Sequence, residues 1–219
     1  MILIFRRNKY ERRRQVKILF ATTNQGKARE LKAAFQKNGF KLDIITNNDL
    51  SNPPVVAETG TTFVQNAKLK AHALADFSQM VTIADDSGLM VEALYGAPGV
   101  RSARYAGAEH NDSKNNAKLL AELGGVPLEK RTAHFNTTIV VSMPNFFNRD
   151  LVVSGQCTGQ ILLAPRGADG FGYDPLFYVA EKGKTFAEMT LLEKNSLSHR
   201  GKAINKLLAI FPTWLAQFE

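Results

Sequence analysis

Two adjacent carboxylates, Asp85 and Asp86, stand at the end of an apolar segment of this 219-residue sequence. Residues 80–84 are apolar and β-branched enough to form a buried strand, which we expect to end at the acids, with Ser87 and Gly88 following. Adjacent acids at the end of a buried strand repel each other unless a cation or a proton separates them, and open α/β sheets bind ligands beyond their strand ends. The pair is therefore a candidate metal or acid–base site. The alternative, that both acids cap a tight turn, fits this stretch equally well.

A second candidate site is the polar turn around Asn24, which joins an expected strand to an expected helix. Backbone N–H groups at a helix start bind phosphate readily. Thr22 and Asn24 offer side-chain hydrogen bonds, and Lys27 offers a mobile positive charge. The turn is not a Walker A loop, because Ala21 stands in place of the first glycine and Ala28 follows the lysine. An ordinary capped turn is the alternative interpretation.

A carboxylate, an amide and a lysine surround the start of the next expected helix. Asn66 and Lys70 are four residues apart and so lie one above the other on one helical face. Glu58 precedes the helix, where the helix dipole favours a carboxylate. Without further context, this pattern favours a structural interpretation in which Glu58 caps the helix and Lys70 is solvated. The buried stripe of this helix is expected to consist of Phe63, Ala67, Leu74 and Phe77.

Two further segments are rich in groups that could contact a flat or anionic ligand. Residues 167–175 contain three glycines beside two aromatic residues, a composition that suggests a backbone lying against a flat ligand, with Phe171 offering a stacking face. Residues 194–201 lead into a final helix. His199 and Arg200 lie near its start, where the helix dipole disfavours cations. A basic pair there is better explained by an anionic or acceptor-rich ligand than by stability.

The expected secondary structure mixes βα units with an antiparallel hairpin, which favours an α/β fold with a mixed sheet. Residues 89–91 are expected to return as a hairpin partner of the Asp85–Asp86 strand, and residues 101–105 to form a polar loop with two cations. Asp112 is expected to cap a helix that runs to about Leu123. The remaining expected strands are 16–21, 41–46, 132–143 and 151–162, and the remaining expected helices are 26–38, one ending near Phe77, and one near the C-terminus.

The net charge of +8 is concentrated in a short N-terminal arm. Residues 1–15 carry a net charge of +5, which leaves +3 for residues 16–219. We therefore expect no nucleic-acid binding by the body of the chain, and interpret 1–15 as a poorly ordered basic extension. No apolar run approaches a membrane-spanning length. The single cysteine, Cys157, excludes an intramolecular disulfide and favours a reducing cytoplasm.

Six motifs in fixed order give the chain a family resemblance. From about Val16 to the C-terminus it resembles the non-standard purine nucleoside triphosphate pyrophosphatases, the inosine/xanthosine triphosphatase family. Thr23 stands where that family often has glycine, and Gln65 where glutamate is frequent. The motifs are ATTNQGK (21–27), ETGTTFVQNAKLKA (58–71), ADDSGL (84–89), GAPGVRSARYAG (96–107), GFGYDPLF (170–177) and EKNSLSHRGKA (193–203).

The resemblance implies that 16–219 form a single two-lobed α/β catalytic domain, with a long mixed sheet and an active cleft between the lobes, and that two such subunits form a homodimer. It implies Mg²⁺-dependent cleavage of a purine nucleoside triphosphate, such as ITP, dITP or XTP, into the monophosphate and pyrophosphate. Glu58 and Asp86 match the metal-linked carboxylates, Asp86 as proton acceptor, and Lys27 and Lys70 would offset phosphate charge. The implied substrate contacts are Thr22, Thr23, Asn24, Gln25, Gly26, Lys27, Asn66, Ser87, Phe171, Gly172, Tyr173, Asp174, Lys194, His199 and Arg200.

The chemistry of the purine ring agrees with this assignment. Hypoxanthine and xanthine present a 6-keto acceptor and an N1–H donor, whereas adenine presents an amino donor and a bare N1. His199 and Arg200 could donate to the keto oxygen, and Asp174 could accept from N1–H. A Maf-like pyrophosphatase acting on pyrimidine or modified nucleotides is the nearest alternative, and the SHR and FGYD motifs argue against it. The full set of carboxylates and lysines also argues against an inactive nucleotide-binding regulator.

Overall fold

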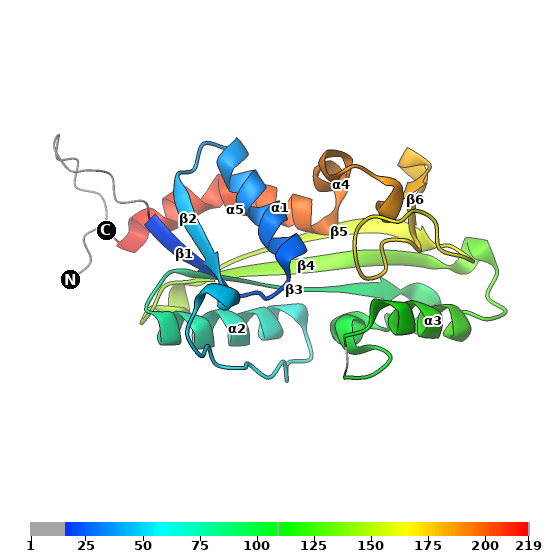
Figure 1. The fold of residues 1–219 in the computed structure, drawn as a ribbon, viewed down its shortest axis with the longest axis horizontal. Helices are drawn as coiled ribbons and strands as arrows, with labels where there is room; N and C mark the ends of the chain where they lie inside the picture. Colours follow the sequence, from blue (N-terminus) through cyan, green and yellow to red (C-terminus); the bar gives the residue numbers. More distant parts are fainter. Residues whose placement is uncertain (1–15, 109, 219) are drawn as a thin grey trace.

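The computed structural model describes residues 16–108 and 110–218, which form one continuous mixed sheet flanked by helices on both faces (Figure 1). The expected arm at 1–15 lies outside the described residues. Across the described part of the chain the strand order is β2-β1-β3-β4-β5-β6-β7. The strands are β1 (Val16–Phe20), β2 (Leu42–Thr46), β3 (Thr82–Val91), β4 (Thr132–Ser142), β5 (Leu151–Ile161), β6 (Phe177–Val179) and β7 (Lys184–Thr185).

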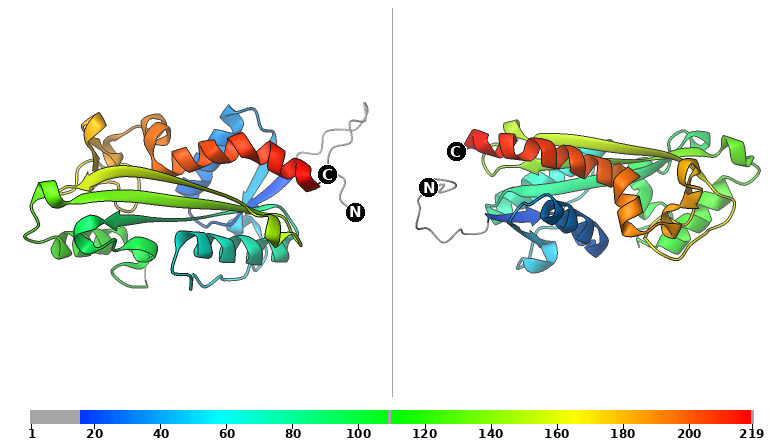
Figure 2. Two further views of the ribbon diagram at one scale, coloured as in Figure 1. Left: turned by 180° about the vertical axis from the view of Figure 1, so that it is seen from behind. Right: turned by 90° about the horizontal axis from the view of Figure 1, so that it is seen from above.

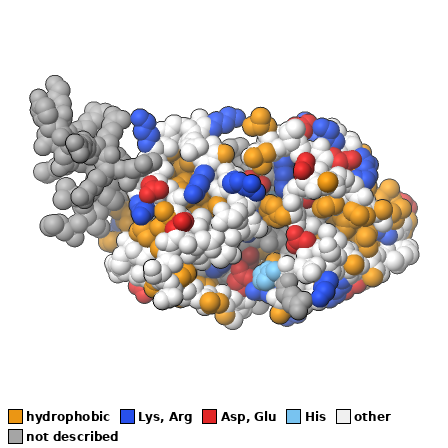
Figure 3. Space-filling view, in the orientation of Figure 1, with side chains coloured by type: hydrophobic (Ala, Val, Ile, Leu, Met, Phe, Trp, Pro, Cys, Tyr) orange, Lys and Arg blue, Asp and Glu red, His pale blue; other side chains and the backbone are white. Residues whose placement is uncertain are grey.

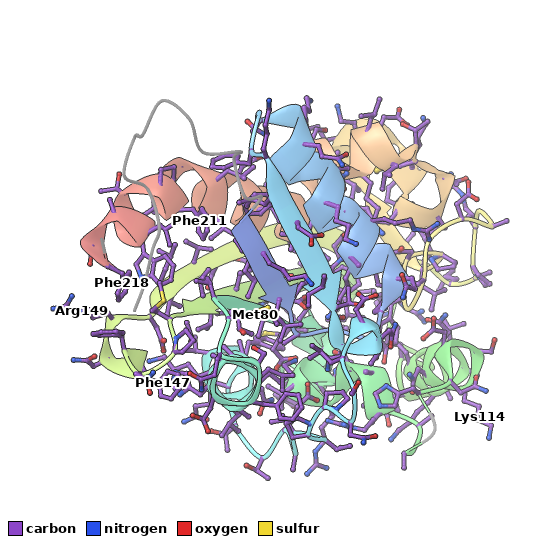
Figure 4. All side chains as sticks on the ribbon, turned by 60° about the vertical axis from the view of Figure 1, so that its left-hand side comes forward. Met80, Lys114, Phe147, Arg149, Phe211 and Phe218 are labelled. Atoms are coloured by element: carbon purple, nitrogen blue, oxygen red, sulfur yellow. The ribbon has the colours of Figure 1, made fainter. Side chains whose placement is uncertain are left out.

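The helices cover the two faces of the sheet as separate layers. They are α1 (Gln25–Lys37), α2 (Phe63–Ser78), α3 (Asp112–Glu122), α4 (Leu191–Leu197) and α5 (His199–Leu215). In Figure 1, α1, α4 and α5 lie above the sheet, and α2 and α3 lie below it, and the view from behind in Figure 2 shows the same two layers. Figure 4, in which Lys114 marks α3, likewise shows α3 beneath the sheet. We call these the upper and lower layers.

The sheet combines parallel and antiparallel pairing, as the sequence predicts. β1 pairs in parallel with β2 and with the start of β3, while β3, β4 and β5 pair antiparallel over ten registered positions for each pair. The expected βα unit at the N-terminus and the hairpin of β4 and β5 are thus confirmed. No helix of the described residues is long and apolar enough to cross a bilayer.

Alternating strand residues build a separate core on each face. On β1, Ile18 and Phe20 pack under α1 and α5, whereas Leu19 faces α2. On β3, Ile83 joins the upper core and Ala84 joins the lower one. A third core, which includes Leu89, closes the far end of the sheet. The alternation follows from the two-residue period of a strand, and it fixes which face each following residue of β3 meets.

The interpretation of residues 80–91 as two strands joined by a turn is wrong. β3 runs without interruption from Thr82 to Val91, through both acids. β4 pairs with every residue of β3, so the backbone stays extended where the side chains turn polar, and residues 89–91 continue the same strand. The turn-cap interpretation of Asp85 and Asp86 is therefore also wrong.

Three smaller expectations are corrected. Phe77 is 46% exposed, because it lies outside the stripe of α2 on which Ala71, Leu74 and Ala75 are buried. Asn111, and not Asp112, caps α3, because its side chain accepts from the Lys114 backbone N–H. The expected loop at 101–105 belongs mostly to a 3₁₀ helix, η3 (Gly99–Arg104).

Candidate active site

The two acids of β3 lie where the strand loses its neighbour. β1 pairs with β3 only at Thr82 and Ile83, so this edge of β3 is open from Ala84 until Ser102 of η3 contacts Leu89 and Pro98 bridges to Met90. Asp85 continues the upper face of Ile83, and Asp86 continues the lower face of Ala84. Figure 3 shows a hollow at the middle of this side of the molecule, between the two layers, with acidic side chains recessed in it. The open edge therefore gives a ligand access to both faces of one strand.

On the lower face, Asp86 meets the polar face of α2. The Asn66 amide donates to Asp86 Oδ2 at 3.1 Å, and Lys70 Nζ lies 3.7 Å from Oδ1. Asn66 Oδ1 in turn accepts from the Gly60 backbone N–H at 2.8 Å, which orients its amide toward Asp86. The expected pairing of Asn66 and Lys70 on one helical face is confirmed, and both side chains point at the acid.

Glu58 joins this group through Lys70. Lys70 Nζ donates to Glu58 Oε1 at 2.7 Å, so one ammonium contacts both carboxylates. Arg104 from η3 reaches the second oxygen of Glu58 at 2.5 Å. Thr62 caps α2, so Glu58 is not the helix cap, and Lys70 is only 17% exposed. The structural interpretation of Glu58 and Lys70 is therefore wrong.

The surroundings separate the pKa values of the two carboxylates. Burial raises the pKa of Asp86 to about 6, with Lys70 opposing and Glu58 adding to the shift. Burial would also raise the pKa of Glu58, but Lys70 and Arg104 outweigh it and hold that pKa below its usual value. Burial would lower the pKa of Lys70, but the surrounding carboxylates raise it overall. Asp86 is thus the carboxyl that can exchange a proton near neutral pH.

On the upper face, Asp85 is buried between two cations. Lys27 Nζ lies 2.9 Å from Oδ2 and Arg200 Nε lies 3.6 Å from the same oxygen. Burial opposes ionisation, yet Lys27 and Arg200 hold the pKa of Asp85 well below its usual value. Ser87, on the same face, donates to Asp85 Oδ2 and shares a hydrogen bond with Thr137. Asp85 therefore holds Lys27, Arg200 and Ser87 in place on the upper face, whereas Asp86, the acid that can exchange a proton, lies on the lower face.

The turn before α1 is a capped helix start at the same open edge. Thr22 Oγ1 accepts from the Asn24 backbone N–H, and Asn24 Oδ1 accepts from the Lys27 backbone N–H. Thr22 is buried, whereas Thr23, Asn24 and Gln25 are exposed. Gly26 borders Phe171, because a Cβ built on it would lie 3.2 Å from that ring. The turn is thus capped, as the ordinary interpretation predicts, and phosphate binding by its exposed outer residues stays a prediction.

The glycine-rich segment brings a buried acid and an aromatic ring to the upper face. Asp174 Oδ2 accepts from Lys194 Nζ at 2.6 Å and from the Phe171 backbone N–H at 2.9 Å. The Phe171 ring lies beneath two cations, 4.8 Å from Lys194 Nζ and 5.6 Å from Arg200 Cζ. Tyr173 is the exception, because its ring is buried in the core near α3 and its hydroxyl donates to the Ser102 carbonyl at 2.8 Å.

Glu30 completes this group, and sequence reasoning missed it. Its Oε2 accepts from Arg200 Nη1 at 2.8 Å, and Oε1 lies 4.0 Å from Lys194 Nζ. All three side chains are nearly fully buried. The protein's own acids therefore compensate the charge of Arg200 at the start of α5, although its Nε donor is left without a hydrogen-bond partner. The missed signal was a charged residue beside Leu31 in the apolar stripe of α1.

His199 lies against aromatic rings at the same helix start. Its ring stacks on Phe135 at 4.6 Å, and Nδ1 is buried without a hydrogen-bond partner, as is Arg200 Nε. Burial and the neighbouring cations lower the pKa of His199 well below its usual value, so the imidazole is neutral. Buried polar atoms without partners are costly, which marks these two as positions for a ligand atom.

The carboxylates on the lower face fit a hard divalent cation. Glu58 and Asp86 supply oxygen ligands at an accessible edge, and Lys70 and Arg104 already hold positive charge beside Glu58. Among residues 16–108 and 110–218, no three His, Cys, Asp or Glu side chains gather into a larger metal-binding group. A cation held here would rely on these two side chains together with oxygens of a ligand or of water.

The match to a family model now places this arrangement among known proteins. The model of the Ham1 family matches residues 18–210. The chain belongs to the Ham1 family. A dITP/XTP pyrophosphatase of Lactobacillus acidophilus is 68% identical over 196 residues, covering 90% of this chain and 97% of that protein. A dITP/XTP pyrophosphatase of Geobacillus kaustophilus is 52% identical over 190 residues, covering 87% and 91%.

Solved Ham1 structures share the fold over nearly the whole described chain. The Ham1 protein of Staphylococcus aureus has a TM-score of 0.79 at 41% identity, covering 90% of this chain and 98% of that one. A HAM1 protein of Coxiella burnetii has a TM-score of 0.83 at 36% identity, covering 91% and 100%. The predicted family and the predicted α/β fold with a long mixed sheet are confirmed.

Proposed function

We propose that this Ham1 protein hydrolyses non-standard purine nucleoside triphosphates, namely ITP, dITP and XTP, to the monophosphate and pyrophosphate. The names of its curated relatives support this substrate class. The observation that carries the proposal is the open edge of β3, where Asp86 has a pKa raised to about 6 beside Lys70 and a second carboxylate, Glu58. Removing such triphosphates keeps deaminated purines out of DNA and RNA.

The lower face supplies the groups for phosphate cleavage. Glu58 and Asp86 would hold Mg²⁺, which when bound polarises phosphate oxygens and stabilises their negative charge. Asp86 accepts a proton from the attacking water, a role suited to its raised pKa. Asn66 holds the Asp86 carboxylate in place. Lys70 offsets negative charge on the phosphates from the lower face, and Lys27 does so from the upper face, with the turn 22–27 presenting backbone and side-chain donors.

The upper face supplies the groups for base recognition. The buried polar atoms without partners, His199 Nδ1 and Arg200 Nε, lie at the helix start where a purine edge would bind. Arg200 donates to the 6-keto oxygen, and Asp174 accepts from N1–H. Neutral His199 can present either a donor or an acceptor, according to its tautomer. Phe171 stacks on the ring, and Lys194 holds Asp174 in place. Adenine has a donor in place of the 6-keto acceptor and an acceptor in place of the N1–H donor. It would therefore leave these buried groups unpaired, at a cost of about 1–3 kcal/mol each.

We also propose a homodimer and a cytoplasmic location. The family resemblance supports the homodimer, and the single, buried, unpaired Cys157 supports the cytoplasmic location. Light scattering on the purified chain gives the mass in solution. A monomer at micromolar concentration would overturn the dimer.

A substrate panel tests the function. Pyrophosphate release is measured from ITP, dITP, XTP, dGTP, ATP and dTTP, with and without Mg²⁺. We expect kcat/KM for ITP and XTP to exceed that for ATP by about a hundredfold or more, which corresponds to two or more unpaired polar groups. Comparable turnover of ATP would refute the base-recognition assignment, and preferential turnover of dTTP would favour the Maf-like alternative.

A further inference from the structure

The base-recognition segment is held from the opposite layer by two side chains of α3. Gly172 lies in the connection between β5 and β6, directly after Phe171. Its backbone N–H donates to Asp112 Oδ2 at 2.7 Å, and its carbonyl accepts from Asn116 Nδ2 at 3.0 Å. Both backbone groups of one residue are thus bound by α3, which belongs to the lower layer (Figures 1 and 4). We call Asp112 and Asn116 the α3 clamp.

The helical geometry explains how two side chains reach one residue. Asp112 and Asn116 are four residues apart, so they lie one above the other on the same face of α3. Asp112 is available for this contact because Asn111 caps the helix. Gly172 has a φ of +62°, a conformation that places its N–H and carbonyl within reach of the two side chains and that other residues adopt only with strain. The clamp therefore depends on the backbone conformation of Gly172.

The amide group of Asn116 has one orientation that fits its surroundings. Its Oδ1 is buried without a hydrogen-bond partner, which is costly for an amide oxygen. Turning the amide over would leave Nδ2 without a partner and would face Oδ1 toward the carbonyl of Gly172, where two acceptors would repel. The donor of Asn116 is therefore committed to Gly172, and helix stability alone gives no reason for an asparagine here.

Gly172 connects the groups that the purine would contact. On one side, the Phe171 ring lies against Lys194 and Arg200 and borders Gly26. On the other, Tyr173 and Asp174 are buried. The preceding residues 163–170 are exposed, although Arg166 and Asp169 already hydrogen-bond to neighbouring backbone. A shift of Gly172 would therefore move the stacking ring and the acid together.

We propose that Asp112 and Asn116 are positioning residues for purine discrimination, because they fix Gly172 and thereby the placement of Phe171 and Asp174. This inference rests on the proposed function for its kinetic consequences, and on the geometry alone for its structural ones. Neither side chain is assigned to contact the substrate. Their effect passes through the backbone of Gly172.

The kinetic test compares Asn116→Ala and Asp112→Ala with Asp112→Asn, which keeps an oxygen acceptor, and with Ser113→Ala, an exposed residue on the same helix. For the two clamp-breaking variants we expect KM for ITP to rise by about fivefold to tenfold, the effect of one lost hydrogen bond, with kcat within about twofold. The ratio of kcat/KM for ITP to that for ATP should fall by a similar factor. Asp112→Asn and Ser113→Ala should behave like the wild type.

Hydrogen exchange provides a readout that does not depend on turnover. In Asn116→Ala and Asp112→Ala, amides of residues 170–176 should exchange about fivefold to tenfold faster, with no comparable change in Ser113→Ala. Wild-type exchange together with a wild-type ITP-to-ATP ratio in both alanine variants would overturn the clamp. A decrease in kcat with an unchanged KM would also overturn the clamp, since it points to general destabilisation. If the wild type cleaves neither ITP nor XTP, the proposed function fails, while hydrogen exchange still decides the clamp.

Discussion

Glu30→Gln is the substitution whose effect follows most directly from the buried charges. In the wild type, Glu30 and Asp85 share Arg200, with Nη1 2.8 Å from Glu30 Oε2 and Nε 3.6 Å from Asp85 Oδ2. Lys194 lies 4.0 Å from the other Glu30 oxygen. Glutamine keeps the shape and one acceptor but removes the charge, so Arg200 is left with Asp85 as its charged partner.

The expected loss of stability can be estimated from this arrangement. Removing one member of a buried pair costs roughly 3–5 kcal/mol when the other charge is left uncompensated. Asp85 and the remaining acceptor of glutamine compensate part of this, so we expect a loss of about 2 kcal/mol, which lowers Tm by roughly 4–8 °C for a chain of this size. Loss of the Arg200 anchor should also weaken discrimination between ITP and ATP.

Urea unfolding measures this prediction, with Glu129→Gln, an exposed glutamate, as the matched control. The midpoint should fall in Glu30→Gln at an unchanged m-value, and the control should match the wild type. A double-mutant cycle with Arg200→Gln should give a coupling of about 1 kcal/mol or more. A change in unfolding free energy below about 0.5 kcal/mol, the usual range for surface substitutions, would refute the reasoning.

Three further predictions concern the open edge and the core. The folded state lowers the pKa of Asp85, so the carboxylate stabilises the fold fully above about pH 4, the pKa of an unfolded aspartate, and this stabilisation is lost as the pH falls further. The difference in unfolding free energy between the wild type and Asp85→Asn, measured by urea unfolding, should therefore become smaller below about pH 4. Cys157 is 4% exposed and burial raises the pKa of its thiol, so a thiol reagent should modify it only at the rate of unfolding, and rapid labelling of the native protein would contradict this. In Gly60→Ala the added Cβ would lie 2.7 Å from Asn66 Oδ1, so the displaced amide should lower kcat by about tenfold or more, and an unchanged kcat would contradict the role of Asn66.

Local patterns in the sequence predicted the elements that carry the site, but not the continuity of β3. Asp85 and Asp86 interrupt an apolar run, so hydrophobic periodicity alone indicates a strand end. The pairing of Asp85 with Ile139 and of Asp86 with Thr138 in β4 keeps the backbone extended there. That pairing joins segments more than fifty residues apart, which no local pattern reveals.

The same limit explains the missed site residues. Glu30 and Arg200 are separated by 170 positions, and only the packing of α1 against α5 brings them together. The sequence marks Arg104 as a cation but gives no sign that it pairs with Glu58, which lies 46 positions before it. By contrast, Asn66 and Lys70 are joined by the helical period itself, and their common face was predictable from spacing.

The products of ITP hydrolysis test the central claim most directly. Phosphorus NMR of ITP with the purified protein and Mg²⁺ should show IMP and pyrophosphate appearing together, and Asp86→Asn, which removes the proton acceptor, should show no turnover. Formation of IDP and phosphate would contradict cleavage between the α- and β-phosphates. Wild-type turnover by Asp86→Asn would contradict the role of the acid on the lower face of β3.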